Sequence, residues 1–213
     1  GRLLEVGCAH GFLLDHLRSR GYRVSGVEVS PLAADYARNT LKLDVRLGSL
    51  ASAGFETGAF DVVMMLDVLE HLHRPMEVLR EVGRVLRPDG VLLVQCPWEL
   101  THWEEVLEAF LRGKRTGCIV PDAVPAHLYF FSPRTLEAIL GKGGFRVVHR
   151  ESGNYGTIRR RVKPPAVNTG SPLERAFRLA YFRLGLQGLL YRAARAAGLG
   201  NGIIRYARYE GFP

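Results

Sequence analysis

The stretch LLEVGCAHGF, residues 3–12, predicts an apolar strand that runs directly into a turn of small residues and then into a helix. Small residues let the backbone approach a ligand closely, and the free N–H groups at a helix start attract an anion. This arrangement is typical of sites for nucleotide-like cofactors. A dinucleotide-binding turn requires glycine at three positions that are here Gly7, Ala9 and Phe12. Hydride-transfer cofactors are therefore disfavoured.

An acidic residue, Glu28, ends the second predicted strand, seventeen residues after Gly11. A carboxylate at that place can accept both hydrogen bonds of a ribose diol. Together, the turn and this carboxylate predict a ligand that contains a ribose and no pyrophosphate.

Short apolar runs alternate with helix-length segments over the first 150 residues. This alternation predicts a doubly wound α/β fold, in which helices cover both faces of a parallel sheet. Ser-Pro pairs at 30–31 and 132–133 predict helix starts, because serine caps a helix and proline suits its first turn. The predicted strands are 2–6, 23–28, 44–47, 60–66, 91–95 and 145–149.

Several segments, taken in order and spacing, resemble the class I S-adenosylmethionine-dependent methyltransferases. The group that they resemble includes the ubiquinone-biosynthesis O-methyltransferases and many small-molecule methyltransferases. The resemblance covers about residues 1–150 and implies a mostly parallel, Rossmann-like sheet with S-adenosyl-L-methionine as the cofactor. The matching segments are EVGCAHG (5–11), GVEVSP (26–31), FDVV (60–63), DVLEHL (67–72), EVGRVLRPDGVL (81–92), HLYFFS (127–132) and GF (144–145).

The resemblance also implies a role for individual residues. Glu5 would reach the ammonium group of the cofactor, residues 7–11 would lie along its methionyl part, and Glu28 would bind its ribose. Residues 49–50 would flank the adenine, and the loop at residues 66–68 would lie near the cationic end. The implied cofactor-binding residues are Glu5, Gly7, Cys8, Ala9, Gly11, Glu28, Val29, Ser49, Leu50, Leu66 and Asp67.

Two positions depart from the family pattern. Ala9 replaces a glycine, a change that a turn with φ below zero would tolerate. Ser49 stands where the family often has an acidic residue that binds the adenine amino group, and its hydroxyl can accept one hydrogen bond.

Three histidines, His71, His102 and His127, are candidate bases, because imidazole can take up a proton near neutral pH. A phenolic acceptor gains from such proton removal. We predict His71 and His127 as catalytic residues, with a structural role for each as the alternative. No metal is predicted, although Asp67, Glu70 and His71 could together hold a divalent cation. Aromatic residues that would cover an apolar or aromatic acceptor, or else belong to the core, are Trp98, Trp103, Tyr129, Phe130 and Phe131.

Basic residues are unevenly distributed along the chain. Residues 1–149 carry 17 Lys and Arg against 18 Asp and Glu, whereas residues 150–213 carry 12 against 3. We therefore predict an S-adenosylmethionine-binding methyltransferase domain over residues 1–150 and a basic, mostly helical C-terminal extension over residues 151–213. A helix is expected over residues 173–197. The extension could meet a nucleic acid or a membrane surface, or its charge could simply be solvated.

The function that these observations predict is methyl transfer from S-adenosylmethionine to a small-molecule acceptor, at oxygen. One alternative is a methyltransferase that acts on a macromolecule or a membrane-held lipid through the basic extension. Another is a non-catalytic, cofactor-binding scaffold. Three widely spaced cysteines indicate neither a disulfide framework nor a cysteine zinc site, so we expect a cytoplasmic location. The chain starts with Gly1 directly before a strand, so we expect its native start to lie upstream.

Overall fold

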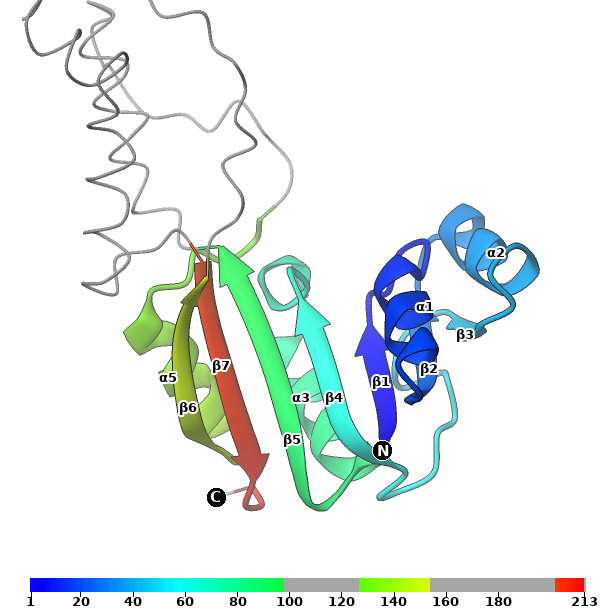
Figure 1. Cartoon of the computed structure of the whole chain (residues 1–213). Helices are drawn as coiled ribbons and strands as arrows, with labels where there is room; N and C mark the ends of the chain where they lie inside the picture. The colour runs from blue at the N-terminus through cyan, green and yellow to red at the C-terminus, as the bar shows by residue number, and fades with distance from the viewer. Residues whose placement is uncertain (98–126, 154–201, 213) are drawn as a thin grey trace, which may run out of the picture.

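The computed structural model describes residues 1–97, 127–153 and 202–212. These residues form a seven-stranded sheet in the order β3-β2-β1-β4-β5-β7-β6 (Figure 1). Strand β7 is antiparallel to both of its neighbours, and the other pairs are parallel. The predicted doubly wound, mostly parallel α/β fold is confirmed. The strands are β1 (Arg2–Val6), β2 (Arg23–Glu28), β3 (Asp44–Leu47), β4 (Phe60–Leu66), β5 (Leu86–Pro97), β6 (Phe145–Gly153) and β7 (Gly202–Tyr209).

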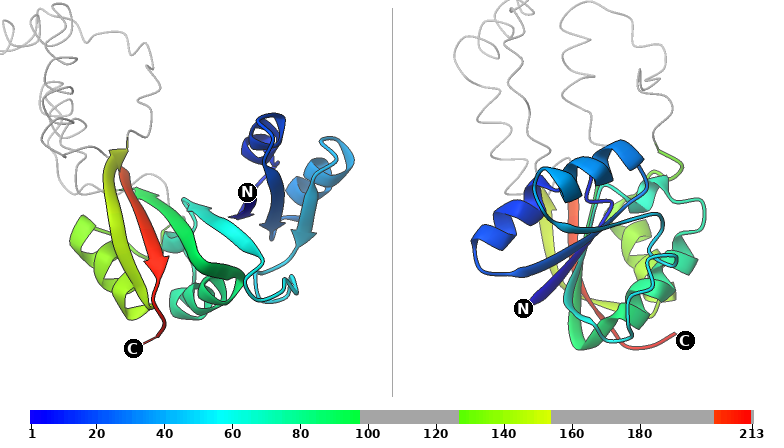
Figure 2. Two further views of the ribbon diagram at one scale, coloured as in Figure 1. Left: turned by 60° about the horizontal axis from the view of Figure 1, so that its bottom comes forward. Right: turned by 90° about the vertical axis from the view of Figure 1, so that its right-hand side faces the viewer.

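Helices cover both faces of the sheet, with α1 and α2 on one face and α3 and α5 on the other (Figure 2). Alternate residues of β4 show this division. Met65 packs in a cluster with Leu79 of α3, whereas Met64 packs in a second cluster with Leu14 of α1. Successive side chains of a strand point to opposite faces, so a strand covered on both faces is apolar throughout. The helices are α1 (Phe12–Ser19), α2 (Pro31–Asn39), the 3-10 helix η1 (Leu69–His71), α3 (Pro75–Val85) and α5 (Pro133–Lys142).

The two Ser-Pro pairs start helices, as predicted. The Ser30 hydroxyl accepts a hydrogen bond from Ala33 N at 3.4 Å at the start of α2. At the start of α5, Ser132 and Thr135 cap each other, with Thr135 N donating to Ser132 Oγ at 3.2 Å and Ser132 N donating to Thr135 Oγ1 at 2.8 Å. Such caps satisfy N–H groups that have no partner within the helix.

Strand β5 is longer than the predicted segment 91–95 because the turn at 88–90 is an irregularity inside the strand. Phe60 of β4 pairs with Leu86, and Val62 pairs with Val91. The extra residues bulge out of the ladder, with Asp89 in the left-handed region at φ +67°.

The sequence analysis did not predict strand β7, which lies between β5 and β6. It comes from the segment 151–213 that was expected to be an extension, so the sheet includes residues beyond 150. Its Arg205 is only 6% exposed and donates from Nε to Glu137 Oε1 of α5 at 2.7 Å. An arginine buried by an acidic partner looks like a solvated basic residue in the sequence alone. The helix expected over residues 173–197 lies outside the described residues, and the helical character of the extension stays a prediction.

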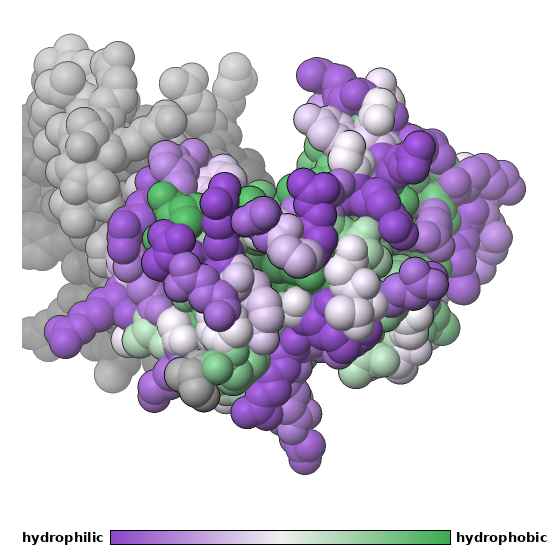
Figure 3. Space-filling model, turned by 90° about the horizontal axis from the view of Figure 1, so that it is seen from below, coloured by the Kyte–Doolittle hydropathy of each residue, from purple (hydrophilic) through white to green (hydrophobic). Residues whose placement is uncertain are grey.

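The two ends of the strands form different surfaces of the molecule. The carboxyl ends of the parallel strands lie at the top of the sheet in Figure 1. Ligands of open α/β sheets bind outside these ends. The opposite end of the sheet, seen from below in Figure 3, is predominantly hydrophilic, with hydrophobic residues in small groups. None of the described helices has the length and apolar character needed to cross a membrane.

Candidate functional site

Backbone hydrogen bonds hold the turn after β1 against β2. Gly7 N and Cys8 N both donate to the carbonyl oxygen of Val27, at 2.8 and 3.2 Å, and Gly11 N donates to Cys8 O at 2.9 Å. Gly7, Ala9 and Gly11 have φ values of +74°, +47° and +81°. The condition under which alanine would be tolerated at position 9, a φ below zero, is therefore not met. This conformation costs a residue with a Cβ about 1–2 kcal/mol, so the surroundings must impose the shape of the turn.

Glu28, at the end of β2, supplies part of that constraint. Its Oε2 accepts a hydrogen bond from Ala9 N at 2.8 Å, and its Oε1 accepts one from Ser30 N at 2.8 Å. The side chain is 8% exposed. A carboxylate oxygen has two lone pairs, so these two bonds leave one on each oxygen for a further donor. The carboxylate predicted opposite the turn thus lies against it and can still receive two hydroxyl groups.

A second carboxylate, that of Glu5, is buried beneath the turn. Glu5 is 6% exposed, and its Oε2 has no hydrogen-bond partner among the described residues. Burial, together with the charge of Glu28, raises the pKa of Glu5 to about 7. Burial and the charges of both carboxylates raise the pKa of the Cys8 thiol to about 12. Two buried acids so close together favour a cation as their neighbour.

The raised pKa of Glu5 predicts a pH-dependent stability. Unfolding returns the pKa from about 7 to its ordinary value near 4.5, so unfolding releases a proton between these two pH values. The free energy of unfolding therefore falls as pH rises through this window, by about 3 kcal/mol for this one group. We expect the Glu5→Gln variant to lack this contribution. Urea unfolding of both proteins at pH 4.5, 5.5, 6.5 and 7.5 measures the difference.

Other carboxyl groups titrate in both proteins, so the informative quantity is wild type minus variant at each pH. A difference that stays constant from pH 4.5 to 7.5 would contradict the assignment to Glu5. An Asp35→Asn variant is a suitable control, because Asp35 is an exposed residue of α2. Its difference from wild type should be flat across this range.

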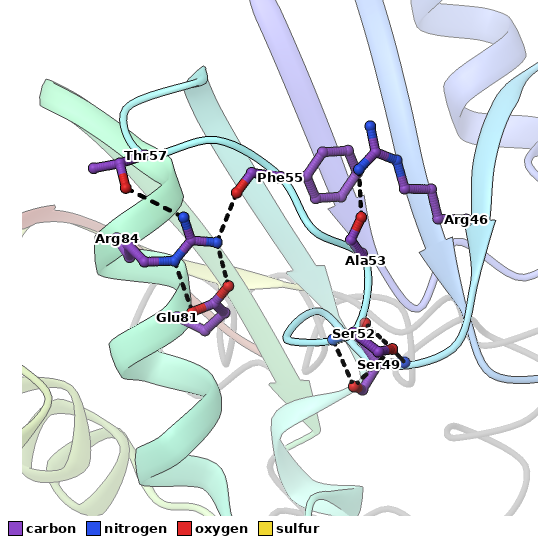
Figure 4. Close-up of polar contacts among 8 residues, drawn as sticks. All are labelled: Arg46, Ser49, Ser52, Ala53, Phe55, Thr57, Glu81 and Arg84. Carbon is purple, nitrogen blue, oxygen red and sulfur yellow. Dashed lines mark hydrogen bonds and ion pairs between the residues drawn. The ribbon is translucent and has the colours of Figure 1, made fainter.

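Ser49, predicted to flank the adenine, has its hydroxyl engaged within its own turn. Ser52 N donates to Ser49 Oγ at 3.2 Å, and Ser49 N donates to Ser52 Oγ at 3.0 Å. The two hydroxyl oxygens lie 3.1 Å apart (Figure 4). One lone pair of Ser49 Oγ stays available for an amino group.

Two arginines hold the loop that follows Ser49. Arg46 donates to the carbonyl of Ala53 and lies over the ring of Phe55, 3.9 Å from its centroid. Arg84 of α3 donates to the carbonyl of Phe55 at 2.8 Å and is paired with Glu81 (Figure 4). The loop between β3 and β4 is thus tied to β3 through Arg46 and to α3 through Arg84.

The turn after β4 approaches the turn after β1. Asp67 has φ +57°, and its N–H donates to Gln95 O at 3.0 Å. Burial raises the pKa of its carboxyl group. A Cβ placed on Gly7 would lie 2.6 Å from Cγ2 of Val68. Only glycine therefore fits at position 7 beside Val68, a contact that the sequence analysis did not predict.

The remaining predicted cofactor residues differ in accessibility. Val29 is 72% exposed beyond the end of β2, and Leu66 is half-buried at the end of β4. Cys8 and Leu50 are 5% and 3% exposed and belong to the two hydrophobic clusters. They shape the loops from within and offer little surface to a ligand.

The structure brings the two predicted catalytic histidines together. The ring centroids of His71 and His127 lie 4.8 Å apart. The backbone fixes this proximity, because Leu128 N and Tyr129 N both donate to the carbonyl oxygen of Glu70, at 2.8 and 3.1 Å. Their link across more than fifty residues was not predictable from spacing. The link depends on the backbone carbonyl of Glu70.

Of the predicted aromatic cover, the structure describes three residues. Phe131 is 6% exposed and belongs to the core, as the alternative interpretation has it, whereas Tyr129 and Phe130 are 38% and 59% exposed. The ring of Phe130 packs edge-on against His127, with centroids 6.3 Å apart. Trp98, Trp103 and His102 lie outside the described residues.

Comparison with known proteins agrees with this geometry. Residues 1–150 match a family model described as a methyltransferase domain. A ubiquinone biosynthesis O-methyltransferase of Nitrosococcus oceani is 26% identical over 169 residues, 76% of this chain and 70% of that protein. A probable S-adenosylmethionine-dependent methyltransferase of Mycolicibacterium smegmatis is 34% identical over 146 residues, 68% of this chain and 52% of that protein.

A solved structure shares the fold. The S-adenosylmethionine-dependent methyltransferase from Archaeoglobus fulgidus superposes with a TM-score of 0.62 at 18% identity, covering 97% of this chain and 85% of that one. The family model, which spans most of the chain, and the strand order with its antiparallel β7 lead to the same conclusion. The chain belongs to the S-adenosylmethionine-dependent methyltransferase family.

Proposed function

We propose that this chain transfers a methyl group from S-adenosylmethionine to an oxygen atom of a small-molecule acceptor. The observation that carries the proposal is the pair of buried carboxylates, Glu5 and Glu28, against the glycine turn after β1. The O-methyltransferase name of the Nitrosococcus oceani relative supports oxygen as the target.

The residues present fit the cofactor. The unpartnered Oε2 of Glu5 is a buried acceptor suited to an ammonium group, and Glu28 keeps two lone pairs for a ribose diol. The close approach of Gly7 and Val68 requires glycine at position 7 and fixes the turn against the loop after β4. We propose that the other residues of the turn and Val29, Ser49, Leu66 and Asp67 complete the site.

The bound cofactor would supply an electrophilic methyl group on a sulfonium. The protein has to align the acceptor oxygen with that methyl group and exclude water, and alignment alone is worth several kcal/mol. Carboxylates near the turn stabilise a cationic ligand. The proximity of the His71 and His127 rings supports a role for this pair in accepting the proton of the acceptor hydroxyl.

Methyl transfer with a labelled cofactor tests this proposal. The protein is incubated with S-adenosylmethionine carrying a radiolabelled methyl group and with catechol, an aliphatic amine or a carboxylic acid, and the labelled product is identified. We expect label on the catechol oxygen. We also expect His71→Ala and His127→Ala to lower kcat by about 10²-fold or more while the cofactor Kd changes little.

The exposed His73 supplies the matched control, because it lies two residues from His71 outside the histidine pair. His73→Ala should keep wild-type kcat. Label found only on nitrogen, or only on macromolecules of an added cell extract, would contradict the small-molecule oxygen assignment.

A further inference from the structure

A groove lies between α3 and α5, on the face of the sheet that these two helices cover (Figure 2). Its volume is about 650 Å³. Sites for small organic molecules have volumes of roughly 300–1,000 Å³, so the groove has the size of a ligand site. The residues that line it include none of those proposed for the cofactor and neither His71 nor His127. The groove is therefore a second site, separate from the one described above.

The walls of the groove are mainly apolar. Met76 of α3 and Ile139 of α5 line it, and both pack against the large hydrophobic cluster of the core, which fixes their positions. Ala138 and Tyr129 line it as well, and both are exposed. A thioether and a phenol ring make favourable contacts with aromatic rings. These walls therefore suit a ligand with an aromatic body.

Basic side chains outnumber acidic ones among the described residues that line the groove. Arg74, Arg80 and Lys142 all line it. The carboxylate of Glu77 lines it too, but Arg74 Nη1 donates to Glu77 Oε1 at 3.2 Å, so this charge already has a partner. Within the part of the chain that the structure describes, neither Arg80 nor Lys142 is paired with a carboxylate. The groove thus carries two uncompensated positive charges.

These two charges lie toward the same end of the groove. The helices α3 and α5 each lead into a strand, β5 and β6, and these strands run in the same direction. Arg80 is one helical turn beyond Met76, and Lys142 is one turn beyond Ala138. Phe212 supports Arg80, whose Cζ lies 4.8 Å from the centroid of the Phe212 ring. The groove therefore has an apolar stretch that leads to a cationic end.

We propose that the groove binds an aryl carboxylate, a small organic anion with an aromatic body. The ring would lie against Met76, Ile139 and Tyr129. The carboxylate would face Arg80 and Lys142, and a guanidinium matches the planar shape of a carboxylate with two parallel N–H groups. A neutral aromatic molecule would leave both cations without a partner, and an aromatic cation would be repelled. The proposal does not depend on methyl transfer, because it uses none of the residues assigned to that reaction.

Equilibrium dialysis with 2-naphthoate, followed by its fluorescence, tests the site. We expect one molecule to bind per chain, at least fivefold more tightly than the neutral analogue 2-naphthylmethanol. Binding of 2-naphthoate should weaken as NaCl is raised from 50 to 500 mM, because salt screens exposed charges. Binding of 2-naphthylmethanol should change little over the same range.

Variants of exposed residues locate the ligand in the groove. Arg80→Gln and Lys142→Gln should each weaken 2-naphthoate binding by about fivefold, as the loss of one exposed ion pair implies. Ala138→Glu and Ala138→Gln form a matched pair of equal side-chain size, and both residues are good helix formers. The glutamate variant should bind 2-naphthoate at least tenfold more weakly than the glutamine variant. Arg134→Gln is the control, because Arg134 is an exposed residue of α5 outside the groove.

Circular dichroism and thermal melting check that each variant folds. His127→Ala should bind 2-naphthoate as wild type does, and a loss of binding in this variant would place the ligand at the histidine pair and overturn the proposal. Equal binding of 2-naphthoate and 2-naphthylmethanol, equal binding by the two Ala138 variants, or no binding at all would also overturn it. Binding in the groove of a protein that transfers no methyl group would contradict the proposed function and support this site.

Discussion

Alanine in place of Gly7 is expected to weaken S-adenosylmethionine binding by about a hundredfold or more and to abolish methyl transfer. Position 7 has φ +74°, and a Cβ there would lie 2.6 Å from Cγ2 of Val68. The turn after β1 would have to move away from the turn after β4, which displaces the backbone that we propose to lie along the cofactor. A hundredfold change in Kd corresponds to about 3 kcal/mol of binding free energy. Calorimetric titration with S-adenosylmethionine measures it.

Two further variants separate backbone strain from the close contact. Gly21 has φ +89° but nothing within 4 Å of its potential Cβ. Gly21→Ala should therefore lose about 1–2 kcal/mol of stability and keep the wild-type Kd. Adding Val68→Ala to Gly7→Ala removes the contacting methyl group and should restore part of the melting temperature. Wild-type cofactor affinity in folded Gly7→Ala would contradict the proposed position of the cofactor.

Strands covered on both faces were predictable because burial leaves a direct mark on their sequences. The bounds of β1 to β4 agree with the prediction, and β1 and β4 are the clearest cases, since each is a mostly apolar run that ends at a turn. Strand β7 was not predictable in this way. Its place depends on antiparallel pairing with β5 and β6 and on a bond between Arg205 and Glu137, 68 residues apart in the chain.

The site was predictable as a set of residue types and much less as a set of contacts. A carboxylate across from the turn follows from the spacing of Gly11 and Glu28. The bond from Ala9 N to Glu28, and the positive φ of Ala9, depend on where the chain lies in space. Likewise, the sequence placed His71 and His127 in the candidate list, but only the bonds to Glu70 O explain why they meet.

The second large effect concerns Glu28. We expect Glu28→Gln to weaken S-adenosylmethionine binding by about 10- to 100-fold, and Glu28→Ala to weaken it further. The carboxylate accepts from Ala9 N and Ser30 N and keeps one lone pair on each oxygen for the ribose. An amide has one oxygen, so its NH₂ group must face one of the two backbone donors and cannot accept from a ribose hydroxyl. Each lost hydrogen bond to a charged group is worth about 1.5–3 kcal/mol.

The same variant has a readout that does not involve the cofactor. The charge of Glu28 contributes to the raised pKa of Glu5, so Glu28→Gln should move the pH-dependent loss of stability assigned to Glu5 toward lower pH. Glu56, an exposed carboxylate in the loop after β3, is the matched control, and Glu56→Gln should change neither the cofactor Kd nor this pH profile. If Glu28→Gln shifts the profile but leaves the Kd unchanged, Glu28 holds the turn without touching the ribose. If it changes both, one carboxylate shapes the turn and binds the sugar, which explains why an alanine can be held at positive φ beside it.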